Sequence, residues 1–483
     1  MSKLKESSVD LSWFRRRPKE ILLGENIDYY KLFYSLKKRH STCYLFESLS
    51  SPRHQDRYYT IGFDPVLELI ATGDQLRIVG KQNAIYQTFG VKQQTEILFQ
   101  HINPYQFLQK NFPLQTYSST HQGGLIGYFS YEAINYFEPS LQLKEHPDFP
   151  TFHFGLYLDG LLYDTETDLL YYYTYDQDRS AYIKDLIQEM AHDHIPTQLQ
   201  ALKQLGHSET VAGHAQAVQN TLAEIRAGNS FQSEVGFKTF YHIDGEKMAV
   251  YHKLRQINPS PYMFYLQFGK YELMGASPEK LVSSINRSVL TTPAAGTVQR
   301  GQNDQEDKAL ARKLLTDPKE IAEHNMLVDL HRNDISRVCE AGSVKVANLM
   351  YIIRFSHVQH IVSDIVGQLA KNKSAYDLLA AILPGGVVTG APKIETIKII
   401  DRNESQPRGP YGGAVGRFSL NGDAAFCLSI RSLFCNGKDC FTQTSSGVVY
   451  DSTVDQEYAE VRKKLAAMEQ TLQSLAEKVT SNV

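Results

Sequence analysis

The chain has 483 residues, and its 50 Lys and Arg residues nearly balance its 53 Asp and Glu residues, so the formal net charge is only −3. This balance argues against nucleic acid or a membrane surface as the partner, because both attract strongly basic proteins. The length allows one large domain or two interlocked domains. Since no run of about 18 apolar residues occurs, we expect no membrane-spanning helix.

The cysteine pattern and the N-terminus bear on the compartment. Five cysteines are scattered without C-x-x-C spacing: Cys43, Cys339, Cys427, Cys435 and Cys440. An odd, unclustered set predicts reduced thiols rather than a disulfide framework or a zinc site. The first twenty residues lack the apolar segment of a secretory signal. We therefore expect a cytoplasmic protein.

The first half of the chain predicts strands separated by turns. Branched and aromatic residues dominate residues 58–72, 123–133 and 152–176. The last of these segments contains a polar Asp-Thr-Glu-Thr-Asp turn between two apolar runs, which is typical of a β-hairpin. Residues 179–207 are polar and favour helix. We place the boundary between two regions there, with an N-terminal region of residues 1–195 and a C-terminal region of residues 208–478.

The second half alternates helices and strands. Residues 210–228 have a helical pattern, and residues 302–332 predict a long helix that breaks at Asp317-Pro318. The chain ends in a helix whose apolar residues recur at steps of three and four. These residues are Val461, Leu465, Met468, Leu472 and Leu475.

Residues 417–449 predict a meander of strands with hairpin turns at Asn421-Gly422 and Asn436-Gly437. The preceding glycine-rich run, residues 412–416, could suggest a dinucleotide-binding loop. It lacks the G-x-G-x-x-G spacing, however, and leads into a predicted hairpin instead of a helix. Consecutive hairpins with separate helices predict an α+β fold, in which largely antiparallel β-sheets pack together and are flanked by helices.

Two glutamate pairs have E-x-x-E spacing on predicted helices. Glu457 and Glu460 share one helical face with Lys464, and Glu320 and Glu323 form the second pair. Two facing carboxylate pairs suit Mg²⁺, which prefers oxygen ligands and keeps positions open for a substrate. Each pair by itself is also typical of a solvated helix, and Glu460 with Lys464 forms an ordinary i,i+4 ion pair.

Two further side chains are candidates for an anion site. Alternation along residues 425–434 places Arg431 on a polar strand face with Cys427 and Ser429. A guanidinium matches two carboxylate oxygens, although a cross-strand ion pair explains the arginine equally well. His360 lies among apolar residues, where a histidine is more often structural than catalytic.

An ordered series of motifs runs from residue 213 to residue 475: GNSFQSEV, NPSPYMFYL, GASPEKLV, TTPAAGT, DPKEIAEHNMLVDLHRND, PGGVVTGAPK, RGPYGGAVG, SIR and DSTVDQEYAEVRKK. The series resembles the chorismate-utilising enzymes, and among them the large subunit (component I) of anthranilate synthase. The first half is similar through YLFESLS, YYTIGFDP and GGLIGYFSYE. The resemblance implies an anthranilate-synthase-like fold and an Mg²⁺-dependent enzyme of tryptophan biosynthesis. Such an enzyme converts chorismate and ammonia to anthranilate and pyruvate.

The resemblance also implies a metal site and a substrate site. Glu323 and Glu460 would bind Mg²⁺ directly, and Glu320 and Glu457 would bind it through water. Lys464 would neutralise the ring carboxylate of chorismate, which the metal also holds.

Other positions match residues around the substrate. Tyr411 and Arg431 match the holders of the enolpyruvyl carboxylate. Thr297 and His360 match residues near the ring, where His360 would assist departure of the ring hydroxyl. Gly447 ends a backbone segment that faces the substrate carboxylates.

Two positions favour ammonia addition within this family. Gln232 stands where water-adding relatives carry a lysine base, and a glutamine cannot act as a base. Ala295 stands where aminodeoxychorismate synthases carry a lysine that attacks the ring, which an alanine cannot do. Both residues resemble the anthranilate type. Aminodeoxychorismate synthase component I remains an alternative, as does an aminodeoxyisochorismate synthase that does not eliminate pyruvate.

A regulatory site is implied by two further segments. The anthranilate synthases bind tryptophan as a feedback inhibitor through residues that match Glu47, Ser48, Asn258, Pro261, Tyr262 and Met263. The alternative explanation is that these segments are a strand start and a rigid turn that contribute only to packing. No glutaminase motif is present, so glutamine-derived ammonia would require a separate amidotransferase subunit, in a heterotetramer by family analogy.

The chain departs from the family pattern at several positions. Relatives usually have G-A-G where this chain has Ser445-Ser446-Gly447. A serine at 445 would restrict the backbone and could add a hydroxyl donor. Ala294 replaces a commoner isoleucine. Residues 233–236, which include Glu234, replace a more apolar run. These departures leave the completion of pyruvate elimination open.

Overall fold

The computed structural model describes residues 9–14, 17–49, 57–112, 123–355 and 358–480, so the start of the predicted N-terminal region lies outside the described residues. The strands are β1 (Lys19–Glu25), β2 (Thr42–Glu47), β3 (Tyr58–Phe63), β4 (Leu67–Thr72), β5 (Gln75–Gly80), β6 (Glu96–Phe99), β7 (Gly124–Phe129), β8 (Phe152–Tyr157), β9 (Asp159–Asp164), β10 (Leu169–Thr174), β11 (Ala201–His207), β12 (Gln232–Asp244), β13 (Tyr262–Phe268), β14 (Tyr271–Ser277), β15 (Lys280–Ile285), β16 (Ser288–Thr291), β17 (Ala294–Gln299), β18 (Lys345–Arg354), β19 (Val358–Gln368), β20 (Gly390–Ala391), β21 (Ala414–Ser419), β22 (Ala424–Leu428), β23 (Ser432–Asn436) and β24 (Asp439–Val448). The α-helices are α1 (Tyr29–Arg39), α2 (Gln82–Phe89), α3 (Pro104–Asn111), α4 (Ser180–Glu189), α5 (Val211–Arg226), α6 (Met248–Ile257), α7 (Asp304–Thr316), α8 (Pro318–Ser336), α9 (Ala375–Ile382), α10 (Lys393–Asn403) and α11 (Val454–Thr480). Short 3-10 helices are η1 (Ser12–Phe14), η2 (Tyr131–Tyr136), η3 (Met190–His192) and η4 (Gly386–Val388).

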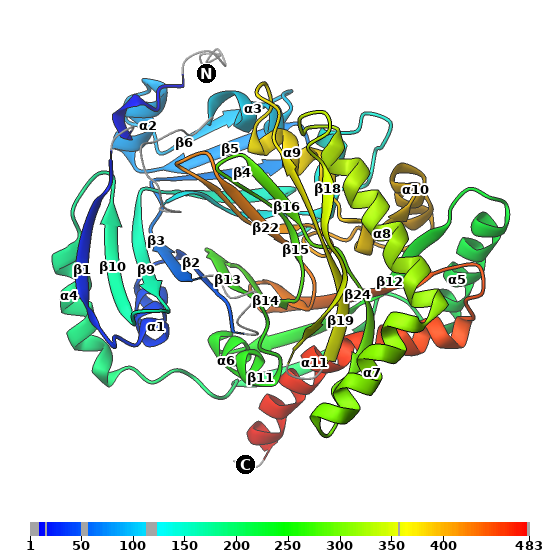
Figure 1. Ribbon diagram of the computed structural model, residues 1–483. Helices are drawn as coiled ribbons and strands as arrows, with labels where there is room; N and C mark the ends of the chain where they lie inside the picture. Colours follow the sequence, from blue (N-terminus) through cyan, green and yellow to red (C-terminus); the bar gives the residue numbers. More distant parts are fainter. Residues whose placement is uncertain (1–8, 15–16, 50–56, 113–122, 356–357, 481–483) are drawn as a thin grey trace.

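The described strands form two antiparallel sheets of twelve strands each (Figure 1). The first sheet has the order β1-β10-β9-β3-β2-β13-β14-β23-β24-β12-β11, and β20 pairs with β12. The second sheet has the order β17-β19-β16-β15-β22-β21-β7-β8-β4-β5-β6, and β18 pairs with β19. This architecture confirms the predicted α+β fold of antiparallel sheets flanked by helices.

Each sheet combines strands from both halves of the chain. In the first sheet β2 pairs with β13, which places Glu47 opposite Met263. In the second sheet β7 pairs with β21, which places Phe129 opposite Ala414. The two predicted regions therefore share both sheets, and the boundary between them stays a prediction.

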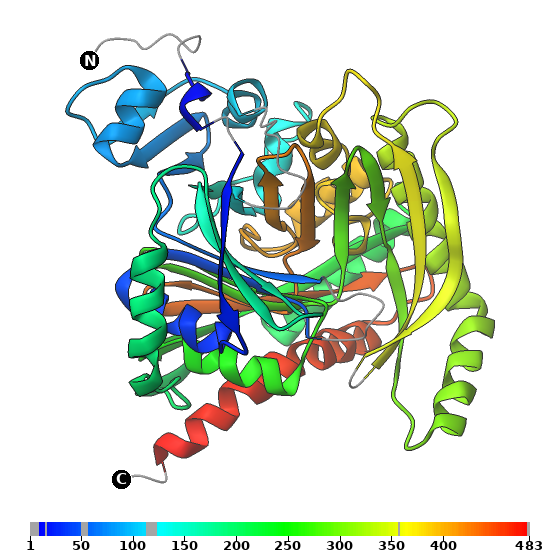
Figure 2. The same cartoon turned by 60° about the vertical axis from the view of Figure 1, so that its left-hand side comes forward.

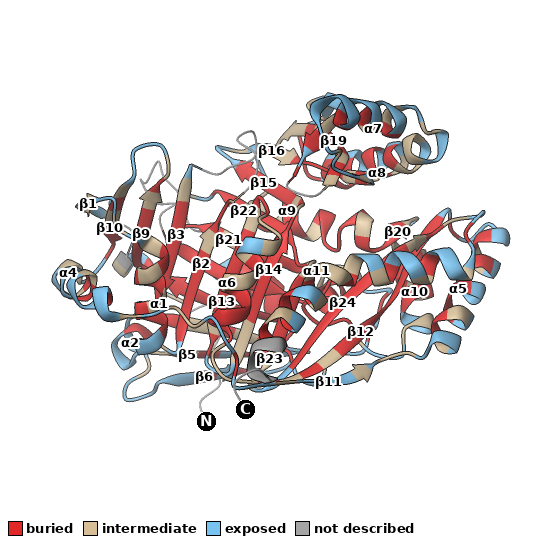
Figure 3. Cartoon of the chain, turned by 90° about the horizontal axis from the view of Figure 1, so that it is seen from below, coloured by how far each residue is buried: buried red, intermediate tan, exposed pale blue. Residues whose placement is uncertain are grey.

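Helices cover the outer faces of the sheets. The terminal helix α11 runs along the first sheet beside β24 and α6 (Figure 2), while α8 packs on β17 and β19. The predicted apolar stripe of α11 is buried, from Val461 to Leu475. Figure 3 shows buried strands and the exposed outer surfaces of α5 and α7. No described helix combines the length and apolarity needed to cross a bilayer.

The predicted helix break at Asp317-Pro318 is confirmed. Asp317 ends α7 and caps α8, since its carboxylate accepts the backbone N–H groups of Lys319 at 2.9 Å and Glu320 at 3.3 Å. Pro318 occupies the first helical position, where its missing N–H costs nothing. The cap thus sets the start of α8, and with it the direction in which Glu320 and Glu323 project.

The helical expectation for residues 179–207 is only partly correct. Helix α4 covers the first part, but the segment ends in strand β11, which pairs along β12 with Ala201 opposite Asp244. Tertiary pairing at the sheet edge overrides the local preference of these polar residues.

The predicted alternation through Arg431 is wrong. Strand β22 ends at Leu428 in the second sheet, and β23 begins at Ser432 in the first sheet. Between them Arg431 has a left-handed backbone with φ of 53°. The chain therefore changes sheets at Arg431, and its side chain reaches α11, where Nη1 donates to the backbone carbonyl of Lys464 at 3.0 Å, instead of lying along one strand face.

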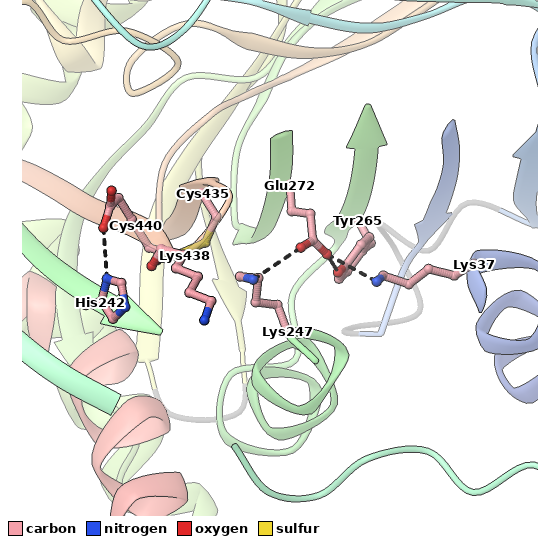
Figure 4. The surroundings of a disulfide bond; sticks show 9 residues. Lys37, His242, Lys247, Tyr265, Glu272, Cys435, Lys438 and Cys440 are labelled. Carbon is pink, nitrogen blue, oxygen red and sulfur yellow. Dashed lines mark hydrogen bonds and ion pairs between the residues drawn. A yellow bond between two sulfur atoms is a disulfide. The ribbon is translucent and has the colours of Figure 1, made fainter. Parts of the chain in front are cut away.

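The prediction of five reduced thiols is also wrong. The turn Asn436-Gly437 closes the β23–β24 hairpin, with a left-handed φ of 65° at Gly437, and places Cys435 directly opposite Cys440. These two residues form a disulfide (Figure 4). The other cysteines are buried outside this bridge. Near the disulfide, Glu272 accepts ion pairs from Lys37 at 3.2 Å and Lys247 at 3.6 Å.

Candidate active site

Strands β12 and β24 form one wall of the candidate site (Figure 1), and α11 packs on β24. Glu234 lies opposite Gly447 in this strand pair. Gln232 and Glu234 are two residues apart and so project from the same face of β12. A Cβ added to Gly447 would lie 2.4 Å from Gln232 Nε2 and 2.9 Å from Glu234 Oε1. A side chain at 447 would therefore displace the ends of both the Gln232 and the Glu234 side chains from their present positions.

The predicted glutamates of α8 lie beside this wall. Gln232 Nε2 donates to Glu323 Oε1 at 3.4 Å. Burial, together with the charges of Glu234 and Glu320, raises the pKa of Glu323 to about 7. Burial and the neighbouring charge of Asp317 also raise the pKa of Glu320. Both carboxyl groups thus occupy a place where negative charge is poorly compensated.

The glutamates of α11 face those of α8. Burial raises the pKa of Glu457, whose Oε2 is buried without a hydrogen-bond partner among the described residues. Partial burial opposes ionisation of Glu460, but Lys464 outweighs that effect and lowers its pKa. The charge of Glu460 in turn raises the pKa of Glu320, Glu323 and Glu457. The four predicted carboxylates therefore lie near enough to one another to affect each other's ionisation.

This carboxylate group fits a divalent cation. Within the part of the chain that the structure describes, no three His, Cys, Asp or Glu side chains already converge closely enough to hold a metal ion. Mg²⁺ seldom requires such a cage, since it is usually bound by one or two carboxylates, waters and substrate oxygens. A bound cation would reduce the repulsion among the four glutamates, and it would give the buried Oε2 of Glu457 a partner.

Two cations lie next to the carboxylates. Lys464 Nζ lies 2.7 Å from Glu460 Oε1 and donates to the carbonyl oxygen of Ser445 at 2.9 Å. Arg431 Nη1 donates to the backbone carbonyl of Lys464 at 3.0 Å. Burial lowers the pKa of Arg431. Burial also acts to lower the pKa of Lys464, but the negative charges of Glu234 and Glu460 outweigh it, so that this pKa is raised.

Ser445 connects two of the site residues. Its hydroxyl lies 2.9 Å from the hydroxyl of Tyr411 and forms a short hydrogen bond with Glu234 Oε2. When Glu234 is ionised, Ser445 must donate to it, so that Tyr411 donates to Ser445. Ser445 lies in the regular β24 ladder, which shows that a serine fits this position without a glycine backbone.

Thr297 and His360, which are predicted to lie near the substrate ring, are on β17 and β19. Thr297 is paired with His360, and Thr297 Oγ1 lies 3.0 Å from His360 Nδ1. Burial lowers the pKa of His360 to about 4, so its imidazole is neutral near pH 7. The carbonyl oxygen of Gly296, 3.1 Å from Nδ1, can only accept. Nδ1 therefore carries the proton, and Nε2 is left with its lone pair. Ala295 is buried and offers no reactive group.

The sequence interpretation assigned no role to Glu279, which lies in the GASPEKLV motif. Its carboxyl group is buried, and Oε1 has no hydrogen-bond partner among the described residues. Burial, with the charge of Glu234 adding to it, raises the pKa of Glu279 to about 8. The side chain is consequently a neutral acid near pH 7. Its acidic side chain inside a motif that carries the family resemblance is the one signal that the sequence offers.

The predicted regulatory residues do not share one cavity. Glu47, Pro261, Tyr262 and Met263 line a cavity of about 700 Å³, a volume that includes some open solvent. Its other lining residues include Phe46, Tyr58, Lys280 and Arg417. Ser48 lies outside this lining, as does Asn258, which instead lines a small cavity with Arg431 and Lys464.

Glu47 does not offer an unpaired carboxylate to the larger cavity. It accepts from Arg255 at 2.7 and 2.9 Å and from the hydroxyl of Tyr251 at 2.8 Å. This arrangement ties β2 to α6. A ligand in this cavity would therefore contact the backbone and the CH₂ groups of Glu47, because the carboxylate is already bound by Arg255 and Tyr251.

Known proteins resemble this chain over most of its length. The sequence pattern of a family described as chorismate binding enzyme matches residues 42–470. Anthranilate synthase component 1 of Leptospira biflexa is 41% identical over 456 residues, which cover 94% of this chain and 95% of that protein. Aminodeoxychorismate synthase component 1 of Bacillus subtilis is 34% identical over 433 residues, which cover 86% of this chain and 89% of that protein. The solved structure of anthranilate synthase component I from Streptococcus pneumoniae matches with a TM-score of 0.73 at 31% identity, over 86% of this chain and 92% of that one.

Proposed function

The chain belongs to the chorismate binding enzyme family and acts on chorismate, and we propose that it is the large subunit of an anthranilate synthase. The observation that carries this proposal is the contact of Gln232 with Glu323, at 3.4 Å. It sets a glutamine beside the carboxylate group, at the position that decides the nucleophile. An amide cannot activate water as a base, and Ala295 cannot attack the substrate ring. Gln232 and Ala295 therefore both favour ammonia as the nucleophile.

Chorismate carries two carboxylates, and the site has cations for each. Lys464 would pair with the ring carboxylate, while Tyr411 and Arg431 would hold the enolpyruvyl carboxylate. Glu323 and Glu460 would hold Mg²⁺, with Glu320 and Glu457 behind them. When bound, the ion supplies positive charge that stabilises the ring carboxylate.

Glu279 is the best acid for the first step. Ammonia forms a bond to C2 of the ring, the ring double bond shifts, and the ring hydroxyl leaves. Because Glu279 is protonated up to a pH of about 8, it can donate a proton so that the hydroxyl leaves as water. The nitrogen loses one proton, and the product is aminodeoxyisochorismate.

His360 is better suited to the second step than to the departure of the hydroxyl. Its proton is held on Nδ1 by the carbonyl of Gly296, so Nε2 can accept a proton. We assign it to remove the proton at C2 while the bond between the ring and the enolpyruvyl oxygen breaks. Pyruvate leaves as its enolate, which is then protonated on carbon, and the ring becomes aromatic. Near neutral pH His360 is unprotonated at Nε2, which is the form that can accept a proton.

We also propose that tryptophan inhibits the enzyme from the cavity lined by Tyr262 and Met263. Aromatic and apolar side chains there suit an indole ring. Arg417 and Lys280, which also line the cavity, suit its carboxylate. The designation of relatives as component 1 supports a separate amidotransferase subunit that supplies ammonia from glutamine. Glutamine should sustain turnover only when that subunit is added.

The test of the proposed function is a direct assay. The purified chain is incubated with chorismate, Mg²⁺ and ammonium, and the products are identified by fluorescence and mass. Anthranilate with pyruvate supports the proposal. Aminodeoxychorismate would make the Bacillus subtilis relative the better guide, and accumulation of aminodeoxyisochorismate would mean that pyruvate is not eliminated.

A further inference from the structure

Two departures from the family pattern touch each other in this structure. Ser445 stands in place of a glycine on β24, and Glu234 interrupts a usually apolar run on β12. Their side chains are hydrogen-bonded to each other, and they are only 2% and 4% exposed. A buried carboxylate needs a partner, and the serine hydroxyl supplies one. The two unusual residues therefore form a matched pair.

The pair lies next to the residue that selects the nucleophile. Glu234 projects from the same face of β12 as Gln232, and both side chains lie against Gly447. Gln232 is 2% exposed, and its Oε1 is buried without a hydrogen-bond partner among the described residues. Its Nε2 donates to Glu323 Oε1 at 3.4 Å. This engagement leaves the amide oxygen turned away from Glu323 as an unused acceptor.

We propose that Gln232 and Glu234 form the binding site for the nitrogen nucleophile, and that Ser445 holds Glu234 in position. This inference rests on the proposed function. Ammonia that attacks carbon must point its lone pair at the ring and its three N–H bonds at the protein. A site made of an amide oxygen and a carboxylate offers acceptors alone, which matches those N–H bonds. Ammonium is attracted to the same carboxylate by charge.

The charged neighbours of Glu234 are already bound to other groups. Lys464 is bound to Glu460 and to the backbone of Ser445. Arg408, whose charge also acts on Glu234, is bound to Glu404 at 2.6 Å. Neither cation forms an ion pair with Glu234 within the described part of the chain, so its carboxylate remains suited to a small cationic or N–H-bearing ligand.

The experiment measures initial rates of the full chain with Mg²⁺, varying ammonium at saturating chorismate and then chorismate at saturating ammonium. Glu234→Gln should raise the KM for ammonium roughly tenfold, the usual effect of losing a hydrogen bond to a charged group. The KM for chorismate should stay equal or fall, because a negative charge beside a dianionic substrate is removed. Ser445→Ala should raise the KM for ammonium in the same direction by less.

Ser233→Ala is the matched control, because Ser233 lies on the opposite face of β12 and should leave both KM values unchanged. An unchanged KM for ammonium in Glu234→Gln would overturn the inference. A parallel rise in both KM values with a lower Tm would also overturn it, since it would indicate a purely structural role. If Glu234→Gln fails to fold, the KM values of Ser445→Ala decide instead. A raised KM for ammonium alone supports the inference, and an unchanged KM for ammonium overturns it. A wild-type chain that forms no nitrogen-containing product would instead overturn the proposed function.

Discussion

Lys464 Nζ lies 2.7 Å from Glu460 Oε1, one turn away on α11. On an isolated helix such a pair would contribute little to stability, since exposed i,i+4 ion pairs are worth only a few tenths of a kcal/mol. Here the pair lies among further carboxylates and beside the backbone of β24. Its importance is therefore expected in binding an anionic substrate and not in folding.

Replacing Lys464 tests that expectation. Lys464→Met should raise the KM for chorismate roughly 10- to 100-fold, because a charge-assisted hydrogen bond to the ring carboxylate is lost. The Tm should change little, since the side chain is partly exposed. Lys463→Met, a change at the exposed neighbouring position, is the control measured in the same steady-state assay. Equal KM values in the two variants would argue against a substrate role for Lys464.

The metal site is tested by Glu323→Gln and Glu460→Gln. Each variant should abolish turnover and the increase in Tm that Mg²⁺ gives the wild-type protein, because binding to the folded state raises its stability. The circular dichroism spectrum should be unchanged. Asp329→Asn, on the exposed side of the same helix α8, is the control. Near-wild-type turnover in either glutamine variant would refute the assignment of that ligand.

Much of this site followed from spacing within single helices. The E-x-x-E pairs and Lys464 were predicted on helical faces, and the capped start of α8 at Asp317 kept that register. Arg431 was misplaced because strand alternation assumes an unbroken strand, whereas the chain changes sheets there. Such a crossover is decided by the partners of β22 and β23, which are distant in sequence.

Burial explains the residues that were missed. Glu279 and Glu234 carry no spacing signal of their own, and their chemistry depends on an environment assembled by both sheets. The pairing of Cys435 with Cys440 follows from the register of the β23–β24 hairpin. The sequence predicts the turn at Asn436-Gly437, whereas the pairing of the two thiols depends on the strand register on either side of that turn.

The role of Glu279 predicts a pH dependence. Because its pKa is raised from about 4.5 to about 8, the acid form is present at neutral pH, and kcat should fall as the pH rises above about 8. Glu279→Gln should lower kcat roughly 100- to 10,000-fold and remove that basic limb from the residual rate. A wild-type profile that stays flat well above pH 8 would speak against Glu279 as the acid.

The same shift affects stability. The folded state holds the Glu279 proton more tightly than the unfolded state, so ionisation of Glu279 destabilises the fold progressively as the pH rises from about 4.5 to about 8. Glu279→Gln removes this contribution. The difference in unfolding free energy between the variant and the wild type should therefore grow in favour of the variant across that interval, as measured by urea denaturation at several pH values.

Tryptophan binding is tested at the larger cavity. Millimolar tryptophan should inhibit the wild-type enzyme and raise its Tm, and Tyr262→Ala should weaken both effects by removing an aromatic wall of the cavity. Leucine at the same concentration is the ligand control. If tryptophan changes neither activity nor Tm, this cavity is not a feedback site.

We expect this enzyme to add nitrogen, and not water, to chorismate and then to release pyruvate. The most direct measurement supplies ¹⁵N-ammonium with chorismate and Mg²⁺ and follows products by mass spectrometry. Anthranilate that carries the ¹⁵N label, formed together with an equal amount of pyruvate, is the predicted result. Isochorismate, or a labelled product that retains the enolpyruvyl group, would contradict the account.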